Sequence, residues 1–229
     1  MKHTSILLAA LCFAITSCAK DPSENVSAAR VQPAQPEGSK QATKPSKPQE
    51  SPAPKNVAQA KDGIPLTGEI IFVGSKVTGS HANRFNQWTG QAHLDAKGML
   101  KGLNITVQTA GIEADFEAPT RWSGKLEEHL RDDDFFASKR FPTAEFKMTT
   151  VQVIPPRADG SNHELKGQLT LRGITKDIQF FATIGAGPRF EATTVFSINR
   201  KDFDMKYDGK KDNLIRDNVV LKIKLQAAP

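Results

Sequence analysis

The sequence predicts an all-β, antiparallel fold within residues 64–229. Apolar and polar residues alternate there with a period of two, as in the stretch through Leu103, Ile105 and Val107, which is typical of strands with one dry face. About nine such stretches are separated by turn residues, and only residues 123–130 have the pattern of a helix. So many amphipathic strands with so little helix leave two solutions, a sandwich or a closed barrel.

The expected elements can be placed in order along this region. The single helix, residues 123–130, has Ser123 as its expected N-cap and carries Leu126 and Leu130 one turn apart on one face. We expect residues 122–142 to close one end of the fold, because they contain more large apolar side chains than an exposed connection needs. The expected strands are residues 69–77, 85–94, 103–107, 112–116, 144–148, 165–171, 178–184, 190–198 and 219–225.

Three segments of different composition divide the chain. Residues 1–17 are typical of an export signal, in which Lys2 precedes an apolar stretch of ten residues. That stretch is far shorter than the roughly 20 residues that a membrane-spanning helix needs. Residues 18–63 are rich in proline and contain no Phe, Trp or Tyr, so they predict a disordered linker. Residues 64–229 contain every such aromatic residue except Phe13 and form the one predicted domain.

The end of the export signal predicts a lipid anchor. Residues 15–18, Ile-Thr-Ser-Cys, resemble the bacterial lipobox, in which the cysteine is acylated and becomes the first residue after cleavage. Cys18 is therefore the predicted anchor, and two acyl chains on it would hold the protein stably on a membrane. Because Ala19 rather than an aspartate follows, we expect the periplasmic face of the outer membrane, in a bacterial cell envelope. The alternative is an ordinary signal peptide with a chance cysteine.

Three linked motifs in the predicted domain carry a resemblance to a known family. They are HLRDDDFF with FPTAEF at 129–146, GQLTLRGITK at 167–176, and FSINRKDF with DNLIRDNV at 196–219. In order and spacing they resemble the YceI-like family, and GSKVTGSH at 74–81 resembles its lipoprotein branch. The sequence departs from the family pattern at Asp204, where a glycine is usual.

The resemblance implies a particular fold and a particular kind of ligand. The implied fold is an extended antiparallel lipocalin-like β-barrel of about eight strands, with one short helix closing an end. The implied ligand is a polyisoprenoid or another long amphiphile, held in an apolar tunnel. Each buried methylene contributes about 0.8 kcal/mol, so a long chain can bind strongly without a specific head-group contact.

The candidate ligand-binding residues are inward-facing positions on the expected strands and two positions near the barrel mouth. The strand positions are Phe146, Met148, Leu169, Phe180, Ala182, Ala192 and Phe196, and the mouth positions are Arg200 and Tyr207. The alternative for the strand positions is a packed core, which would make the domain a structural or interaction protein without a lipid ligand. The alternative for Arg200 is an ion pair with Asp217 that ties the last strands together.

Catalytic, metal and nucleic-acid patterns are missing from the sequence. Residues 19–229 contain no cysteine, and the four histidines there lie in separate segments, without a zinc-site spacing. Among these, His129 is expected to hold the helix through a carboxylate. The net charge of +6 is modest, and the run at residues 200–212 is nearly neutral because it mixes five basic residues with four aspartates, so no nucleic-acid partner is expected. We predict a non-enzymatic envelope lipoprotein that binds an amphiphilic lipid and needs no cofactor or metal. The sequence indicates neither a protein partner nor an oligomeric state.

Overall fold

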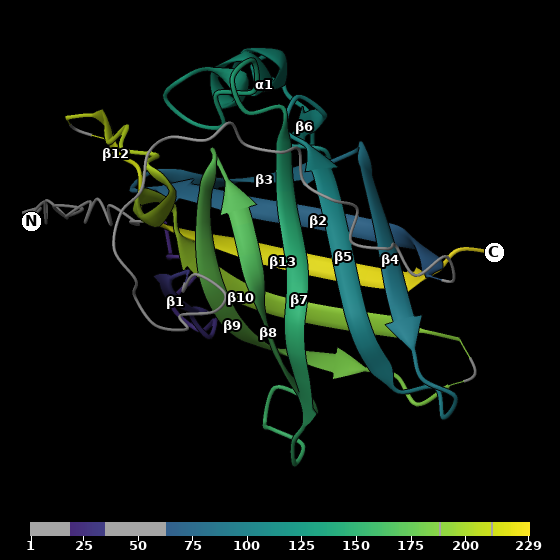
Figure 1. The fold of residues 1–229 in the computed structure, drawn as a ribbon. Coiled ribbons are helices and arrows are strands. Elements are labelled where there is room, and N and C mark those ends of the chain that lie inside the picture. Colours follow the sequence, from purple (N-terminus) through teal and green to yellow (C-terminus); the bar gives the residue numbers. More distant parts are fainter. Residues whose placement is uncertain (1–18, 35–62, 188, 212) are drawn as a thin grey trace, which may run out of the picture.

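The computed structural model describes residues 19–34, 63–187, 189–211 and 213–229. Its sheet closes into an antiparallel barrel of eight strands, with the single α-helix, α1 (Ser123–Arg131), across one end (Figure 1). The predicted barrel and its closing helix are therefore confirmed. The eight strands, in spatial order, are β2 (Ile64–Lys76), β4 (Trp88–Leu94), β5 (Leu100–Gln108), β7 (Thr143–Val153), β8 (His163–Leu171), β9 (Ile174–Ile184), β10 (Glu191–Asn199) and β13 (Asn218–Ala227).

Short elements extend this ring at its ends. β3 (Gly79–Phe85) continues the line of β4 along β2, and β6 (Ile112–Ala114) pairs with β3 in turn. A 3₁₀ turn, η1 (Arg200–Phe203), follows β10, and a two-stranded hairpin of β11 (Gly209–Lys210) and β12 (Asn213–Leu214) precedes β13.

The ring closes where the last strand meets the first strand of the barrel. β13 pairs with β2 from Val220 opposite Val73 to Ala227 opposite Leu66. Inward side chains of the closed sheet are buried as the period-two pattern predicts, and Leu103, for example, is 4% exposed. In contrast, β9 and β10 pair only at Thr183 and Ile184 and then separate.

Residues 19–34 differ from the predicted disordered linker, because they pack on the barrel. Within them, β1 (Arg30–Pro33) pairs with β9, and Ala29 donates its N–H to the carbonyl of Ser197 on β10 at 2.8 Å. The segment thus fills the space where β9 and β10 separate. A short polar segment cannot fold alone, but the unpaired backbone groups of two strand edges give it hydrogen-bond partners. The remainder of the predicted linker, residues 35–62, and the predicted signal with Cys18 lie outside the described residues.

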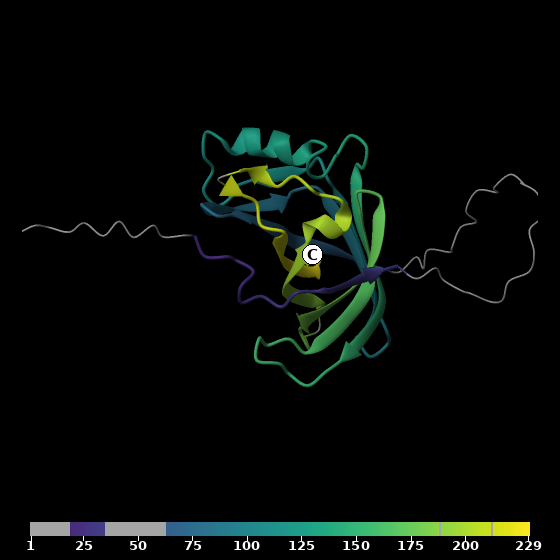
Figure 2. The same ribbon diagram turned by 90° about the vertical axis from the view of Figure 1, so that its left-hand side faces the viewer.

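We call residues 19–33 the strap, and its other end is fixed at the tip of the β2–β3 hairpin. The N–H of Ala19 donates to the carbonyl of Val77 at 3.3 Å, and Arg216 forms an ion pair with Asp21 at 3.4 Å. Burial raises the pKa of Asp21, but hydrogen bonds from Ser23 and the charge of Arg216 outweigh that effect and lower it, so the ion pair remains charged. Figure 2 shows the strap in purple, crossing the side of the barrel that faces the viewer.

The strap explains an unusual burial pattern on the outside of the barrel. Val73, Ser197 and Val220 face outward by strand alternation and lie in one row across β2, β13 and β10, yet they are 6%, 2% and 1% exposed. Because the strap is fixed on β10 at one end and beside β2 at the other, it passes over this row.

The described residues include no helix that is long and apolar enough to cross a membrane.

We predict that the strap contributes to stability by covering Val220. In the full chain, Val220→Ala should lower the free energy of unfolding by about 1.5–3 kcal/mol, as expected for buried methyl groups. The matched change Val195→Ala, at an outward position that is 50% exposed, should cost less than about 0.5 kcal/mol. In a chain lacking residues 20–33, Val220→Ala should cost no more than Val195→Ala. Urea unfolding measures all of these values, and an equal cost of Val220→Ala with and without the strap would contradict the assignment.

Candidate functional site

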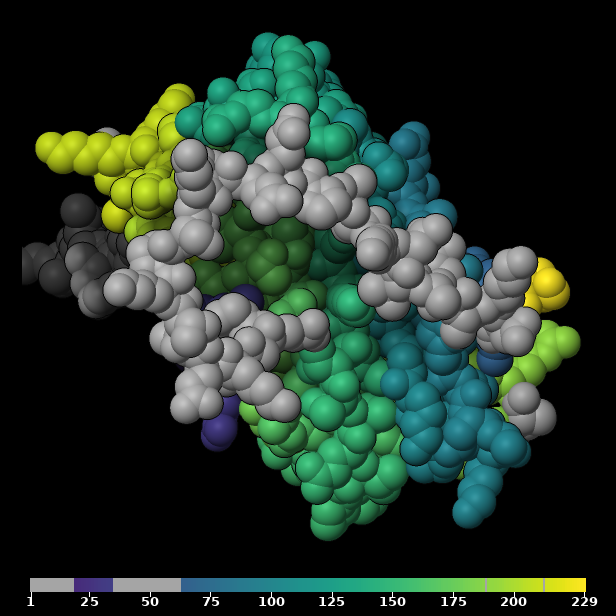
Figure 3. Space-filling model, in the orientation of Figure 1, coloured from purple at the N-terminus to yellow at the C-terminus, as the bar shows by residue number. Residues whose placement is uncertain are grey.

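An apolar cavity of about 460 Å³ lies inside the barrel. This volume is within the range of about 300–1,000 Å³ that is usual for small-molecule sites. The lining side chains come from seven of the eight barrel strands, β4 being the exception, and from β3, α1 and the segments that follow α1 and β10. Figure 3 shows the molecular surface recessed below the teal α1 segment, above the green strands.

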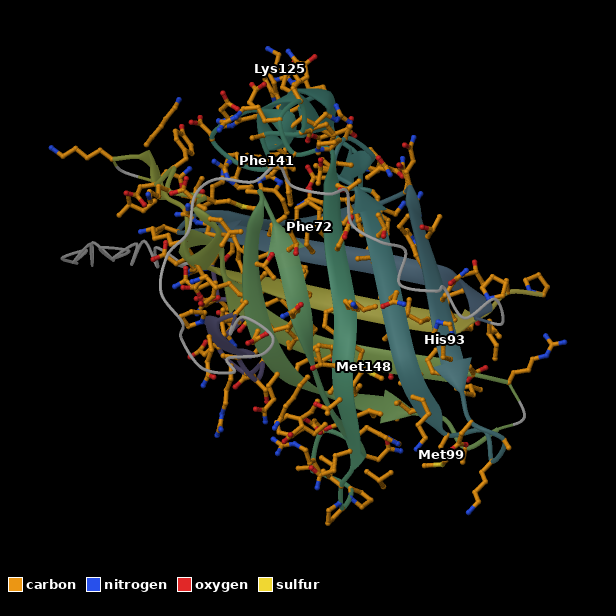
Figure 4. All side chains as sticks on the ribbon, viewed as in Figure 1. Phe72, His93, Met99, Lys125, Phe141 and Met148 are labelled. Atoms are coloured by element: carbon orange, nitrogen blue, oxygen red, sulfur yellow. The ribbon has the colours of Figure 1, made fainter. Side chains whose placement is uncertain are left out.

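Eight of the nine predicted ligand-binding residues line this cavity. They are Phe146, Leu169, Phe180, Ala182, Ala192, Phe196, Arg200 and Tyr207. The exception is Met148, which is buried but does not line the cavity. It lies on β7 beyond Phe146, toward the end away from α1 (Figure 4), where the pairing of β7 with β8 shifts register. Its side chain fills the core at that point instead of bordering open space.

The predicted aromatic residues form one wall of the cavity. The rings of Phe180 and Phe196 stack with their centroids 4.4 Å apart, and Phe146 lies 5.6 Å from Phe180. Gly167 permits this arrangement, because a Cβ atom at that position would overlap the Phe146 ring. The aromatic rings lie on one side, and other lining positions carry the small side chain of alanine. If every lining position carried a large side chain, these side chains would fill the interior, so the alanines leave the cavity open.

The cavity also has a polar residue in its wall that the sequence analysis did not select. Asn83 on β3 is 2% exposed, and its Nδ2 donates to the carbonyls of Phe72 and His81 at 3.4 and 3.1 Å. Those two donors orient the amide, and its Oδ1 has no hydrogen-bond partner among the described residues. Leaving such a buried oxygen unpaired costs about 1–3 kcal/mol, so this atom suits a donor supplied by a ligand or a water molecule. Residue 83 lies between the expected strands 69–77 and 85–94, so the sequence carried no period-two signal that would have selected it.

The segment around α1 closes one end of the cavity, as predicted. Phe136 packs edge-on against Phe72 and Phe85, with ring centroids 5.5 and 5.4 Å away. His129 Nε2 lies 3.0 Å from a carboxylate oxygen of Asp134, so the expected carboxylate contact is present but stays within the closing segment, while the imidazole ring packs against Tyr207 with ring centroids 5.1 Å apart. Trp122 differs from the expectation, because it is 54% exposed and its ring contacts the Arg121 and Lys125 cations instead of the core.

The helix also begins differently from the prediction. Ser123 does not cap α1, whose N-cap is Trp122 without a side-chain bond. The Ser123 hydroxyl instead accepts the N–H of Thr120 at 2.9 Å and donates to Asp115 at 3.3 Å. It thereby fixes the loop that enters the helix.

Arg200 lies at the cavity wall but is fully engaged with its own chain. Its guanidinium forms an ion pair with Asp217 at 3.1 Å, and its other donors reach the carbonyls of Met205 and Arg216. Hydrogen bonds from Lys201 hold the pKa of Asp208 below its usual value, so that this neighbouring carboxylate is also charged. The predicted Arg–Asp tie is confirmed. At 2% exposure, the side chain of Arg200 holds the end of the barrel together.

The described residues contain no group of three or more His, Cys, Asp or Glu side chains placed to hold a metal ion. The arrangement as a whole is a largely apolar chamber, and among the described residues two of its lining side chains, Asn83 and Ser75, have a buried oxygen without a hydrogen-bond partner. Such a site can bind a mainly apolar molecule that carries few polar atoms.

We predict that Phe135 is needed for the closed end. It is 9% exposed, and its ring contacts the rings of His129 and Tyr207 at centroid distances of 4.9 and 5.7 Å. Phe135→Ala should therefore lower the free energy of unfolding by about 3–5 kcal/mol. Trp122→Ala is the control and should cost less than about 1 kcal/mol, because that side chain is exposed. Chemical denaturation gives both values, and similar small losses would show that the end is closed by other residues.

Comparison with known proteins places these features in a wider group. A family model described as a YceI-like domain matches residues 58–227. UPF0312 proteins of Shewanella are similar: that of Shewanella denitrificans is 31% identical over 137 residues, which cover 55% of this chain and 64% of the relative. The protein of Shewanella oneidensis is 30% identical over the same length. The chain therefore spans less than two thirds of the length of these curated relatives.

Two solved structures share the fold. BcnA of Burkholderia cenocepacia aligns with a TM-score of 0.58 and 18% identity, covering 70% of this chain and 96% of that protein. A polyisoprenoid binding domain from Saccharophagus degradans, implicated in plant cell wall breakdown, aligns with a TM-score of 0.53 and 14% identity, covering 73% of this chain and all of that domain.

Proposed function

The chain belongs to the YceI-like domain family, and we propose that its barrel binds one long-chain isoprenoid or similar amphiphilic lipid. The observation that carries the proposal is the apolar cavity of about 460 Å³ in a closed barrel. The polyisoprenoid-binding domain of Saccharophagus degradans, which shares the fold, supports the same class of ligand. In this proposal the chain sequesters or transports its ligand and catalyses no reaction.

The cavity favours this function over a packed structural barrel. A packed barrel would have inward side chains that meet across its axis, whereas this one leaves space beside the Phe146, Phe180 and Phe196 wall. An apolar chain that fills such space gains about 0.8 kcal/mol for each methylene it buries. The unpaired Oδ1 of Asn83 supports a ligand with a hydrogen-bond donor, such as a hydroxyl group, near that side chain.

We further propose that the chain is a lipoprotein of the bacterial cell envelope. Cys18 would carry the acyl chains, and Ala19 after it favours the periplasmic face of the outer membrane. The support is the Ile-Thr-Ser-Cys sequence at residues 15–18 and the apolar signal before it. In this arrangement the barrel would stay close to the membrane that supplies or receives its ligand.

The ligand proposal is tested by extraction. We expect mass spectrometry of solvent extracts from the purified protein to show a stoichiometric isoprenoid or other long-chain amphiphile. Ala192→Trp places a large ring at a cavity-lining position and should remove most of the ligand. Val195→Trp, on the same strand but facing outward, is the matched control and should retain it. Repeated absence of any amphiphile from the parent protein would refute the function, and equal retention by both variants would show that the ligand binds outside the cavity.

The anchor proposal has its own test. Cys18→Ser removes the acylated thiol, so labelling with a radioactive or clickable fatty acid should be lost, and the uncleaved precursor should accumulate. Cys12→Ser, within the predicted signal, is the control and should leave labelling unchanged. If the Cys18→Ser protein were still labelled and processed like the parent, the lipobox assignment would be wrong.

A further inference from the structure

Three segments that are distant in the sequence meet at one corner of the barrel. They are the tip of the β2–β3 hairpin, the β11–β12 hairpin and the start of the strap. Val77 donates its N–H to the carbonyl of Leu214 at 3.2 Å and accepts the N–H of Ala19 at 3.3 Å. The side chain of Thr78 bonds to that of Asn213 at 2.9 Å. We call residues 19–20, 76–79, 209–211 and 213–214 the lip, and Figures 1 and 2 both show their segments gathered where the described N-terminal part begins.

The lip exposes two large apolar side chains next to one another. Val77 is 38% exposed and Leu214 is 50% exposed, although their backbones are hydrogen-bonded. Single exposed apolar residues are common on soluble proteins and need no explanation. Two on adjacent hairpins, at the edge of an apolar cavity, form a surface that a hydrocarbon environment would stabilise.

The lip also carries positive charges that form no salt bridge with another described residue. Lys20, Lys210 and Lys211 are exposed and Lys76 is half-buried, and none of the four forms a salt bridge within the described part of the chain. By contrast, the nearby carboxylate of Asp208 is engaged by Lys201 and Arg200. Asp212, a further acidic residue between Lys211 and Asn213 in the sequence, lies outside the described residues and is not part of the lip.

The cavity reaches the surface beside the same segments, because the exposed Lys210 belongs to its lining, and we call this opening the mouth. Its lining includes Lys76, Lys210 and Asn213, together with Arg216 immediately after the lip. Arg216 Nη2 donates to the carbonyl of Ala19 at 2.8 Å, so the start of the described N-terminal segment is fixed beside this mouth. The residue before Ala19 is Cys18, and consecutive Cα atoms are only about 3.8 Å apart.

We propose that the lip is a membrane-contact surface that seats the mouth of the cavity on an anionic phospholipid bilayer. Val77 and Leu214 would enter the boundary between head groups and acyl chains, while the lysines would contact lipid phosphates. A ligand could then pass between the bilayer and the cavity without crossing water. The contact goes beyond lipid binding by the cavity, and it would hold the barrel in one orientation whether or not a ligand is inside.

The test uses the processed, acylated protein, which begins at Cys18, reconstituted into vesicles of phosphatidylethanolamine and phosphatidylglycerol. Because residues 19–229 contain no cysteine, a single introduced cysteine can be labelled with an environment-sensitive fluorophore after the thiol of Cys18 is acylated. The labelled positions are Val77→Cys and Leu214→Cys on the lip, and Val153→Cys, an exposed position at the far end of β7, as the control. Flotation of the vesicles first establishes that each variant is membrane-attached.

Nitroxide-labelled lipids then report which positions touch the bilayer. We expect the labels at 77 and 214 to lose most of their fluorescence and the label at 153 to lose almost none. Equal quenching at all three positions would overturn the proposal, because the barrel would then have no preferred orientation. Stronger quenching at 153 would also overturn it, since the opposite side would face the membrane.

The charge contribution has a matched pair of variants. Lys210→Glu with Lys211→Glu should weaken the contact reported at position 77 by at least about fivefold for each lysine, and replacing phosphatidylglycerol by a zwitterionic lipid should weaken it as well. Lys222→Glu with Lys224→Glu, on the exposed outer face of β13, should leave quenching unchanged. Equal effects of the two pairs would contradict a specific role for the lip. Extraction of the bound ligand measures only whether the cavity is occupied, whereas quenching measures only how the barrel lies on the membrane. Failure of the orientation experiment can therefore be told apart from failure of the proposed function.

Discussion

The pairing of β13 with β2 is the constraint on which the rest of the structure depends. Once these two strands pair over residues 66–73 and 220–227, every inward side chain faces a closed interior that only other side chains or a ligand can fill. α1 and the phenylalanines after it close one end of that interior. The largely apolar cavity is a consequence of ring closure with small residues, such as Ala182 and Ala192, at some inward positions.

The N-terminal segment packs where two neighbouring strands of the barrel, β9 and β10, separate from one another. β9 and β10 share two residue pairs, and beyond them each would present unpaired backbone groups. The strap satisfies them, with β1 on β9 and Ser27 and Ala29 on Ser197. Two arginines hold the neighbouring region in different ways: Arg200 is buried and ties η1 to the start of β13, whereas Arg216 joins the strap to the mouth. The strap therefore connects three parts of the protein through direct contacts: the gap between β9 and β10, the mouth of the cavity, and the chain that leads to the predicted anchor.

The all-β, antiparallel class was predictable from the sequence because its strands have one wet and one dry face, whereas the choice of a barrel over a sandwich came from the resemblance to the YceI-like family. The inward orientation of residues such as Phe180 and Phe196 followed directly from the period-two alternation of apolar and polar residues. The strap was not predictable in this way, since its partners on β9 and β10 lie far along the chain and its own composition is that of a linker. Alternation also identifies inward positions without showing which of them border open space. For this reason Met148 was included among the ligand-binding candidates, whereas Asn83 was missed because β3 was not among the expected strands.

The most direct test of the account is whether an isoprenoid occupies the cavity. Methyl resonances of ¹³C-labelled Ile, Leu and Val side chains should be followed by NMR while farnesol, a short isoprenoid alcohol, is added to protein stripped of its ligand. The account predicts intermolecular NOEs from the isoprenoid to Leu169 and Ile223, which line the cavity, and none to the exposed Val153. NOEs confined to surface methyl groups, or none at any concentration, would contradict it.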